Sequence, residues 1–174
     1  MLMLNKQARN LGLIAIAVSG ITIASCSKDD NPTKVYRSKE YTLNSSATGT
    51  TASGKVIVQE TSDSTFRLIV KLDKSTKDTV YTFAIYKGNK GATAPFDTAI
   101  SLGKIKSQTT GAALEAKIDR IDSIKINETT KKKFTYDSLL KYDGFARVSF
   151  VDLKVPATPK DSIVAIGNIG KNAQ

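Results

Sequence analysis

The sequence predicts an all-β domain, an antiparallel Ig-like or Greek-key β-sandwich of about seven to nine short strands with one short helix near residues 136–141. Three observations predict it. Apolar and polar residues alternate with a period of two, most clearly in 65–73 (TFRLIVKLD). Further short segments rich in β-branched and aromatic residues are separated by turn-forming residues. Only one stretch has a helical pattern. The strand spacing also fits a closed barrel, so the sequence leaves that alternative open.

Nine segments are candidate strands, and the serine-rich turn 61–64 joins the second and third of them as a hairpin. The segments on either side of 119–120 are two strands or one bent strand. The candidates are 35–43, 54–60, 65–73, 79–86, 99–106, 112–118, 121–127, 145–153 and 163–169.

The single predicted helix covers 136–141 (YDSLLK). Thr135 is a suitable N-cap, and Asp143-Gly144 supplies a helix stop with a residue that can take positive φ. Burying one face of each strand predicts a core that includes the apolar residues Phe66, Leu68, Val70, Leu72, Val148 and Phe150.

The first 25 residues have the pattern of a signal peptide. Lys6 and Arg9 give a positive start, and residues 11–24 (LGLIAIAVSGITIA) are almost wholly apolar. This run is shorter than the ~20 residues that a membrane-spanning helix needs. We therefore expect a signal peptide over 1–25, a flexible tether over 26–34 and the β-sandwich domain over 35–174.

Cys26 is the only cysteine, and Ile23-Ala24-Ser25-Cys26 resembles the lipobox of bacterial lipoproteins. The resemblance implies cleavage between Ser25 and Cys26, a diacylglycerol on the Cys26 sulfur and an acyl group on the new amino terminus. Two or more acyl chains hold a protein firmly on a membrane, because each buried methylene contributes ~0.8 kcal/mol. The alternative is an ordinary secretory signal followed by an unpaired thiol in an oxidising compartment.

The residues after Cys26 predict a final location. Ser27 is not the aspartate typical of inner-membrane retention, and Lys28-Asp29-Asp30 resembles the acidic export signal of surface lipoproteins in one large group of Gram-negative bacteria. The resemblance implies a lipid-anchored protein of the outer membrane, exposed at the cell surface. The alternative is a solvated tether, which is compatible with the same location.

The stretch from Tyr136 to the C-terminal region resembles the end of the CHRD-like domains of exported bacterial lipoproteins. The residues that support the resemblance are Leu139, Leu140, Asp143, Gly144, Phe145, Gly167, Ile169, Gly170 and Asn172. It implies a β-sandwich. Members of that family have histidines on a mid-domain strand and on a later strand, but the corresponding positions here, 83–86 and Ser149, have none. The fold is therefore expected without any metal site that those histidines form.

The chain contains no histidine, which excludes His-dependent nucleophilic catalysis and His/Cys zinc sites. We predict no catalytic residue, no metal ligand set and no cofactor. A carboxylate pair remains possible because 16 acidic residues are present, so a hydrolase acting on surface glycans stays an alternative. Asp119 and Asp122 alone are too few oxygen ligands for a calcium loop.

Six Asp-Ser or Asp-Thr pairs are each followed by a threonine or an aliphatic residue, a triplet that resembles the acceptor of bacterial O-linked glycans. The same pairs also turn or cap a β-protein backbone, and both interpretations stay open. The possible acceptors are Ser64, Thr79, Thr98, Ser123, Ser138 and Ser162.

The chain is basic, with 26 lysines and arginines and a net charge of +10; loss of Lys6 and Arg9 with the signal lowers this charge to +8. The basic residues are spread along the chain, which does not favour nucleic-acid binding. The partners that fit are the membrane, through the lipid anchor, and anionic envelope polysaccharide, lipopolysaccharide or an envelope protein. The alternative is that the excess charge serves only solubility. The leading hypothesis is a non-enzymatic binding or structural lipoprotein. The alternatives are an assembly protein that docks an envelope partner and a carboxylate hydrolase.

Overall fold

A computed structural model describes residues 34–125, 130–152 and 160–173. The chain divides into two units, Met1–Lys34 and Val35–Gln174, and every described helix and strand belongs to the second unit. The predicted signal peptide, Ser25, Cys26 and the predicted export signal Lys28, Asp29 and Asp30 lie outside the described residues.

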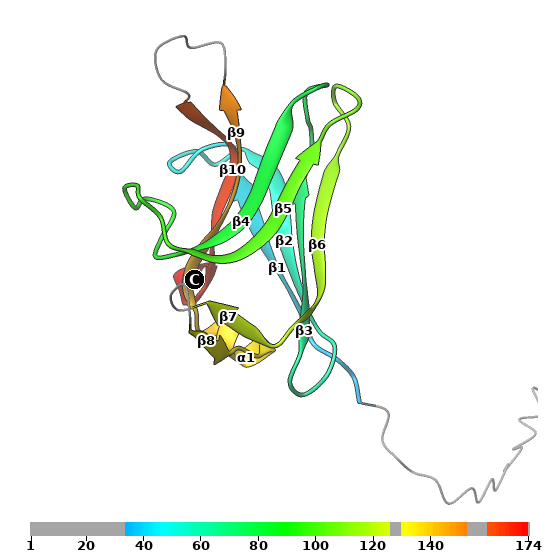
Figure 1. Cartoon of the computed structure of the whole chain (residues 1–174), viewed down its shortest axis with the longest axis vertical. Coiled ribbons are helices and arrows are strands. Elements are labelled where there is room, and N and C mark those ends of the chain that lie inside the picture. The colour runs from blue at the N-terminus through cyan, green and yellow to red at the C-terminus, as the bar shows by residue number, and fades with distance from the viewer. Residues whose placement is uncertain (1–33, 126–129, 153–159, 174) are drawn as a thin grey trace, which may run out of the picture. The chain divides into compact units, whose positions relative to one another are not determined.

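Eight of the strands form one antiparallel sheet in the order β5-β4-β9-β10-β1-β2-β3-β6, and β7 and β8 form a separate pair (Figure 1). The elements are β1 (Ser38–Asn44), β2 (Ala52–Glu60), β3 (Phe66–Leu72), β4 (Val80–Lys87), β5 (Thr98–Lys106), β6 (Leu114–Ile121), β7 (Ser123–Lys125), β8 (Lys131–Lys133), α1 (Tyr136–Leu140), β9 (Asp143–Asp152), β10 (Lys160–Gly170) and the 3₁₀ turn η1 (Lys171–Ala173).

The all-β antiparallel fold class is confirmed, and the arrangement of the layers differs from a sandwich of separate sheets. Two four-stranded halves are joined where Asn44 of β1 pairs with Ile166 of β10. A Cβ on the neighbouring Gly167 would meet the backbone carbonyl of Thr42 and lie 2.9 Å from Leu43, so glycine permits this close approach. The outer strands β5 and β6 contact each other, and the sheet therefore curls around a single core.

The core lies inside this curled sheet and is built from residues between Tyr41 and Ile169. Five of the six predicted core residues are buried, and Phe150 is half-buried against Tyr81, with ring centroids 5.8 Å apart. The three largest fully buried side chains are those of Phe66, Phe83 and Phe145. Burial of each large apolar side chain contributes ~1.5–3 kcal/mol, so this domain needs no disulfide for a stable core.

The hairpin between β2 and β3 is confirmed. The Ser62 hydroxyl accepts hydrogen bonds from the backbone N–H groups of Ser64 and Thr65, at 3.3 and 3.0 Å. Of the two alternatives at 119–120, the structure has one strand: β6 continues through Ile121, with a register shift at 119–120 in its pairing with β3, and β7 begins after Asp122.

The N-terminus of the helix is also confirmed: the Thr135 hydroxyl accepts a hydrogen bond from the Ser138 N–H at 3.3 Å. The prediction that Gly144 ends the helix with positive φ is wrong, because Gly144 lies in β9 and is absent from the glycines with positive φ. The glycine that takes positive φ beside the helix is Gly170, at the end of β10. A Cβ there would lie 2.6 Å from the Leu139 carbonyl, which explains the need for glycine.

Candidate functional site

The short elements β7, β8 and α1 gather at one end of the domain (Figure 1). Phe134 holds β8 there, because its N–H donates to the Asp122 carbonyl at 2.6 Å and its buried ring packs 5.9 Å from Phe66. The Phe134 ring also makes an edge contact with Tyr142 at 5.3 Å. One aromatic side chain therefore links the β7-β8 pair to the core and to the segment that follows the helix.

The helix α1 is fixed from two sides. Its Tyr136 and Leu139 side chains are buried. On the outer side, the Arg37 guanidinium bonds Glu60 at 2.9 Å and Asp137 at 2.8 Å, and it lies 4.7 Å from the centre of the Tyr136 ring. The hydrogen bond from Arg37 holds the pKa of Asp137 below its usual value, so the ion pair is present at neutral pH.

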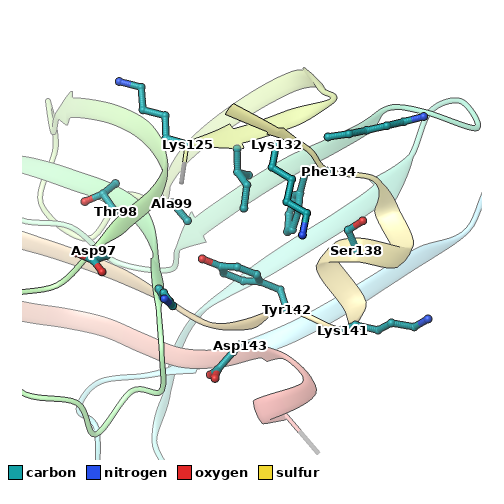
Figure 2. A pocket seen from close by; sticks show the side chains of 13 residues that line it. Asp97, Thr98, Ala99, Lys125, Lys132, Phe134, Ser138, Lys141, Tyr142 and Asp143 are labelled. Carbon is teal, nitrogen blue, oxygen red and sulfur yellow. The ribbon is translucent and has the colours of Figure 1, made fainter. Parts of the chain in front are cut away.

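A cavity of about 880 Å³, which we name the lysine cavity, lies between these short elements and the ends of β4, β5 and β9 (Figure 2). It has five lysines, two aspartates, two hydroxyl side chains, the Tyr142 phenol and an apolar remainder. The lining residues are Lys87, Asp97, Thr98, Ala99, Ile124, Lys125, Lys132, Lys133, Phe134, Ser138, Lys141, Tyr142 and Asp143.

The lining of the lysine cavity has an excess of positive charge. Within the described part of the chain, none of the five lysines forms a salt bridge. Asp143 is already engaged, since Asn172 donates to it and the Lys171 amine lies 3.3 Å from it. Those two hydrogen bonds lower the pKa of Asp143, which keeps it ionised. The five lysines that line the cavity therefore outnumber its two aspartates, and one of these aspartates is already paired.

Tyr142 gives the cavity a polar group on an aromatic wall. Burial is the main reason why its pKa is raised, and the charges of Asp143 and Asp97 raise it further. The phenol therefore stays protonated at neutral pH and can donate a hydrogen bond. In Figure 2 the hydroxyl points into the cavity and Lys132 extends toward Phe134 and Tyr142, whereas Lys125 and Lys141 extend outward from the rim.

A junction of β9, β10 and η1 holds Tyr142 and Asp143 in place. The Asn172 side-chain amide donates to the Gly88 carbonyl at 3.0 Å as well as to the Asp143 carboxylate, and the Lys171 N–H donates to the Tyr142 carbonyl at 3.1 Å. Several residues that support the CHRD-like resemblance meet here, among them Asp143, Gly170 and Asn172. Their visible role in this chain is to fix one wall of the cavity.

A second cavity of about 560 Å³, which we name the seam cavity, lies where the edge strands β5 and β6 approach β7. It shares Thr98, Ala99, Ile124 and Lys125 with the lysine cavity. Its other lining residues are Ile100, Ser101, Ile118, Arg120, Ile121, Asp122, Ser123 and Lys131.

The six predicted glycan acceptors do not form one site. Ser64 and Thr98 are exposed, while the other four are half-buried. Three of them, Thr98, Ser123 and Ser138, line one or both cavities. Ser64 lies in the β2-β3 turn, Thr79 directly precedes β4, and Ser162 lies in β10.

Asp119 and Asp122, the residues considered for a calcium loop, are engaged by neighbouring side chains. Asp119 pairs with Arg67 at 2.6 Å and Lys117 at 3.6 Å, and Asp122 accepts a hydrogen bond from the Ser123 hydroxyl at 2.8 Å. Among the residues that the structure describes, no three His, Cys, Asp or Glu side chains form a group that could hold a metal ion. At the positions that correspond to the family histidines, Phe83 and Ser149 are buried within the sheet.

Sequence reasoning missed the lysine cavity. The run Lys131-Lys132-Lys133 is not among the candidate strands, yet it forms β8, and all three of its residues are exposed. The other lysines of the cavity come from the end of β4, from β7 and from the residue after α1. The one signal in the sequence was the run of three lysines directly before Phe134. Three exposed charged residues are followed there by an aromatic residue whose buried ring anchors β8 to the core.

The fold and the cavities define an all-β domain with an open, positively charged, aromatic-walled cavity at one end. Comparisons of the chain with protein-family models, with curated proteins and with solved structures found no match. In the part of the chain described here, no helix has the length and apolar character to cross a bilayer.

Proposed function

We propose that this protein is an exported, lipid-anchored lipoprotein of the outer membrane, exposed at the cell surface, whose β domain binds an anionic ligand without catalysing a reaction. The observation that supports anion binding most directly is the set of five lysines that line the lysine cavity, which form no salt bridges with the described residues. The lipobox at Cys26 supports the anchored location.

Charge and shape together favour an anion of some size. Like charges held close to one another repel, and an anion placed among them removes that repulsion. Thr98, Ser138 and the Tyr142 hydroxyl offer hydrogen bonds, while Phe134 and Ile124 offer apolar surface. A bare inorganic ion would leave most of an 880 Å³ cavity unfilled, so a ligand with an organic body fits better.

The geometry gives little support to the hydrolase alternative. The two carboxylates of the lysine cavity are Asp97 and Asp143. Asp143 accepts hydrogen bonds from Asn172 and Lys171, and its pKa is lowered. A glycosidase general acid needs a raised pKa so that it is protonated at neutral pH. Asp143 therefore does not suit the role of general acid, and we propose the non-catalytic role.

The binding proposal is tested with the mature chain, residues 26–174, in which Cys26→Ser keeps the protein soluble. We expect it to bind polygalacturonate or phosphatidylglycerol vesicles but not neutral dextran, and we expect the affinity to fall as salt is added. Lys132→Ala with Lys133→Ala should weaken binding by about ten-fold, since exposed ion pairs contribute up to ~1 kcal/mol each.

The matched control for that experiment is Lys74→Ala with Lys77→Ala, which removes two exposed lysines from the loop between β3 and β4. Ser75 in that loop bonds Ser107 at 2.7 Å, next to the β5-β6 connection and away from the lysine cavity. If the two double variants lost affinity equally, net charge alone would explain the effect, and the lysine cavity would be refuted as the binding site.

The anchor is tested separately in cells. Labelled palmitate should enter the wild-type chain and should not enter the Cys26→Ser variant, which should also leave the membrane fraction. Label in the serine variant, or equal membrane retention of both chains, would refute lipidation at Cys26.

A further inference from the structure

We infer that the lysine cavity and the seam cavity form one cleft, and that this cleft holds a linear acidic glycan of several sugars. The inference rests on the proposed function, because it names the ligand class of the same site. Its basis is the shared lining: Thr98, Ala99, Ile124 and Lys125 belong to both cavities. A ligand that fills one cavity therefore contacts residues of the other.

The combined cleft is elongated. Along β5 its lining runs from Asp97 to Ser101, four residue steps or roughly 13 Å at strand geometry. At the Asp97 end the lining also includes Asp143 and Lys87, whose N–H donates to the Asp97 carbonyl, and the seam part also includes Ile118 of β6. One hexose ring is shorter than this path, so a single sugar would leave part of the cleft unfilled.

Cationic residues line each part of the path, with Lys125 and Lys141 at its rim. Lys132, Lys133 and Lys141 line the first part, Lys125 lies in the shared part, and Arg120 and Lys131 line the seam. In the described portion of the chain, neither Arg120 nor Lys131 forms a salt bridge. Cations at intervals along a cleft match a polymer that has a charge on every repeat, and a compact ligand with one charge would use few of them.

The chemistry of the lining favours a sugar chain over an inserted peptide strand. The side-chain hydroxyl groups of Thr98, Ser101 and Ser138 line the cleft and can bond sugar hydroxyls. A peptide strand that extends a sheet binds mainly through main-chain hydrogen bonds, which these side chains do not supply.

The test measures affinity against ligand length. Calorimetry with the mature Cys26→Ser chain would compare galacturonate oligomers of two and six sugars. We expect the hexamer to bind at least about ten-fold more tightly, since it reaches additional cations. Arg120→Ala with Lys131→Ala should weaken hexamer binding by about five-fold or more and leave dimer binding unchanged, whereas Lys132→Ala should weaken both.

The outcomes separate this inference from the proposed function. Equal affinity for dimer and hexamer, or equal effects of the Arg120 and Lys131 changes on both, would overturn the single cleft and leave anion binding in the lysine cavity intact. Hexaglutamate binding as tight as that of the galacturonate hexamer would overturn the glycan assignment. Arg120 and Lys131 are exposed, so their substitution should preserve the fold, which an unchanged thermal midpoint would verify.

Discussion

Replacement of Leu139 by alanine tests how the helix α1 holds the wall of the lysine cavity. Leu139 is fully buried, and the helix presents Ser138 to the cavity on the turn that Leu139 anchors. Leu→Ala at a buried position removes the apolar side chain and leaves a void, at a cost of about 3–5 kcal/mol. A domain of this size has a free energy of unfolding of ~5–15 kcal/mol, so the variant should lose a large share of its stability.

The neighbouring Leu140 supplies a matched control because it lies in the same helix and is half-buried. Leu140→Ala makes the same chemical change with the same gain in helix propensity, and it should cost only about 1 kcal/mol of transfer free energy. Urea denaturation measures the free energy of unfolding of both variants. Its slope against urea concentration should be the same as in the wild type. Leu139→Met should recover most of the loss, because it preserves volume. Equal costs at the two leucines would refute the claim that α1 is anchored through Leu139.

The remaining predictions concern the cap, a glycine and two carboxylates. Thr135→Ala should destabilise the domain by about 1 kcal/mol and Thr135→Ser by much less, measured by urea denaturation, because serine keeps the capping oxygen. Gly170→Ala should lower the thermal midpoint far more than Gly103→Ala. Both glycines have positive φ, but only Gly170 has carbonyl oxygens where a Cβ would lie, so equal shifts would contradict the packing argument. The folded-state pKa values of Asp137 and Asp143 are lowered, so their stabilising contribution is present above the unfolded pKa of about 4 and is lost as pH falls through the lower folded values. Denaturation between pH 5 and 2 should show a smaller loss of stability in the Asp137→Asn, Asp143→Asn double variant than in the wild type.

The strands were predictable from the sequence because a strand with one buried face shows an alternation of apolar and polar residues within its own segment. In β3 the buried residues alternate without a break, as the period-two pattern requires. The cap at Thr135 was predictable for the same reason, since the donor and acceptor are three residues apart. Such features depend on neighbours in the sequence and need no knowledge of the fold.

The glycine at the helix end shows where local reasoning fails. Gly144 follows the helix closely, and a helix stop was a sound expectation for it. Gly170 takes the positive φ beside the helix, although it lies in a strand 30 residues after Leu140. Only the pairing of β9 with β10, in which Gly170 is opposite Asp143, brings it to the end of α1. No pattern within one element contains that information.

The lysine cavity could not be predicted for a related reason. Lys87, Lys125, Lys132 and Lys141 belong to four separate segments, and each has the composition of an ordinary solvated strand end or loop. Their proximity follows from β4 being paired with β9 and from Phe134 anchoring β8 to the core. The sequence provided the total charge, and the topology determined where that charge gathers.

The Asp-Ser and Asp-Thr pairs show how a local sequence preference and the topology of the sheet act together. A short side chain that bonds the backbone is placed where a chain enters a strand or helix, and this local preference explains why Thr98, Ser123 and Ser138 each lie at or near the start of an element. Because the sheet curls, the starts of β5, β7 and α1 lie around the same space, and the three hydroxyl groups line the two cavities. An O-linked glycan at any of them would occupy the cleft that we assign to an acidic glycan. At these three positions the modification and the binding role therefore exclude each other, whereas Ser64, Thr79 and Ser162 line neither cavity, so a glycan there leaves the cleft open.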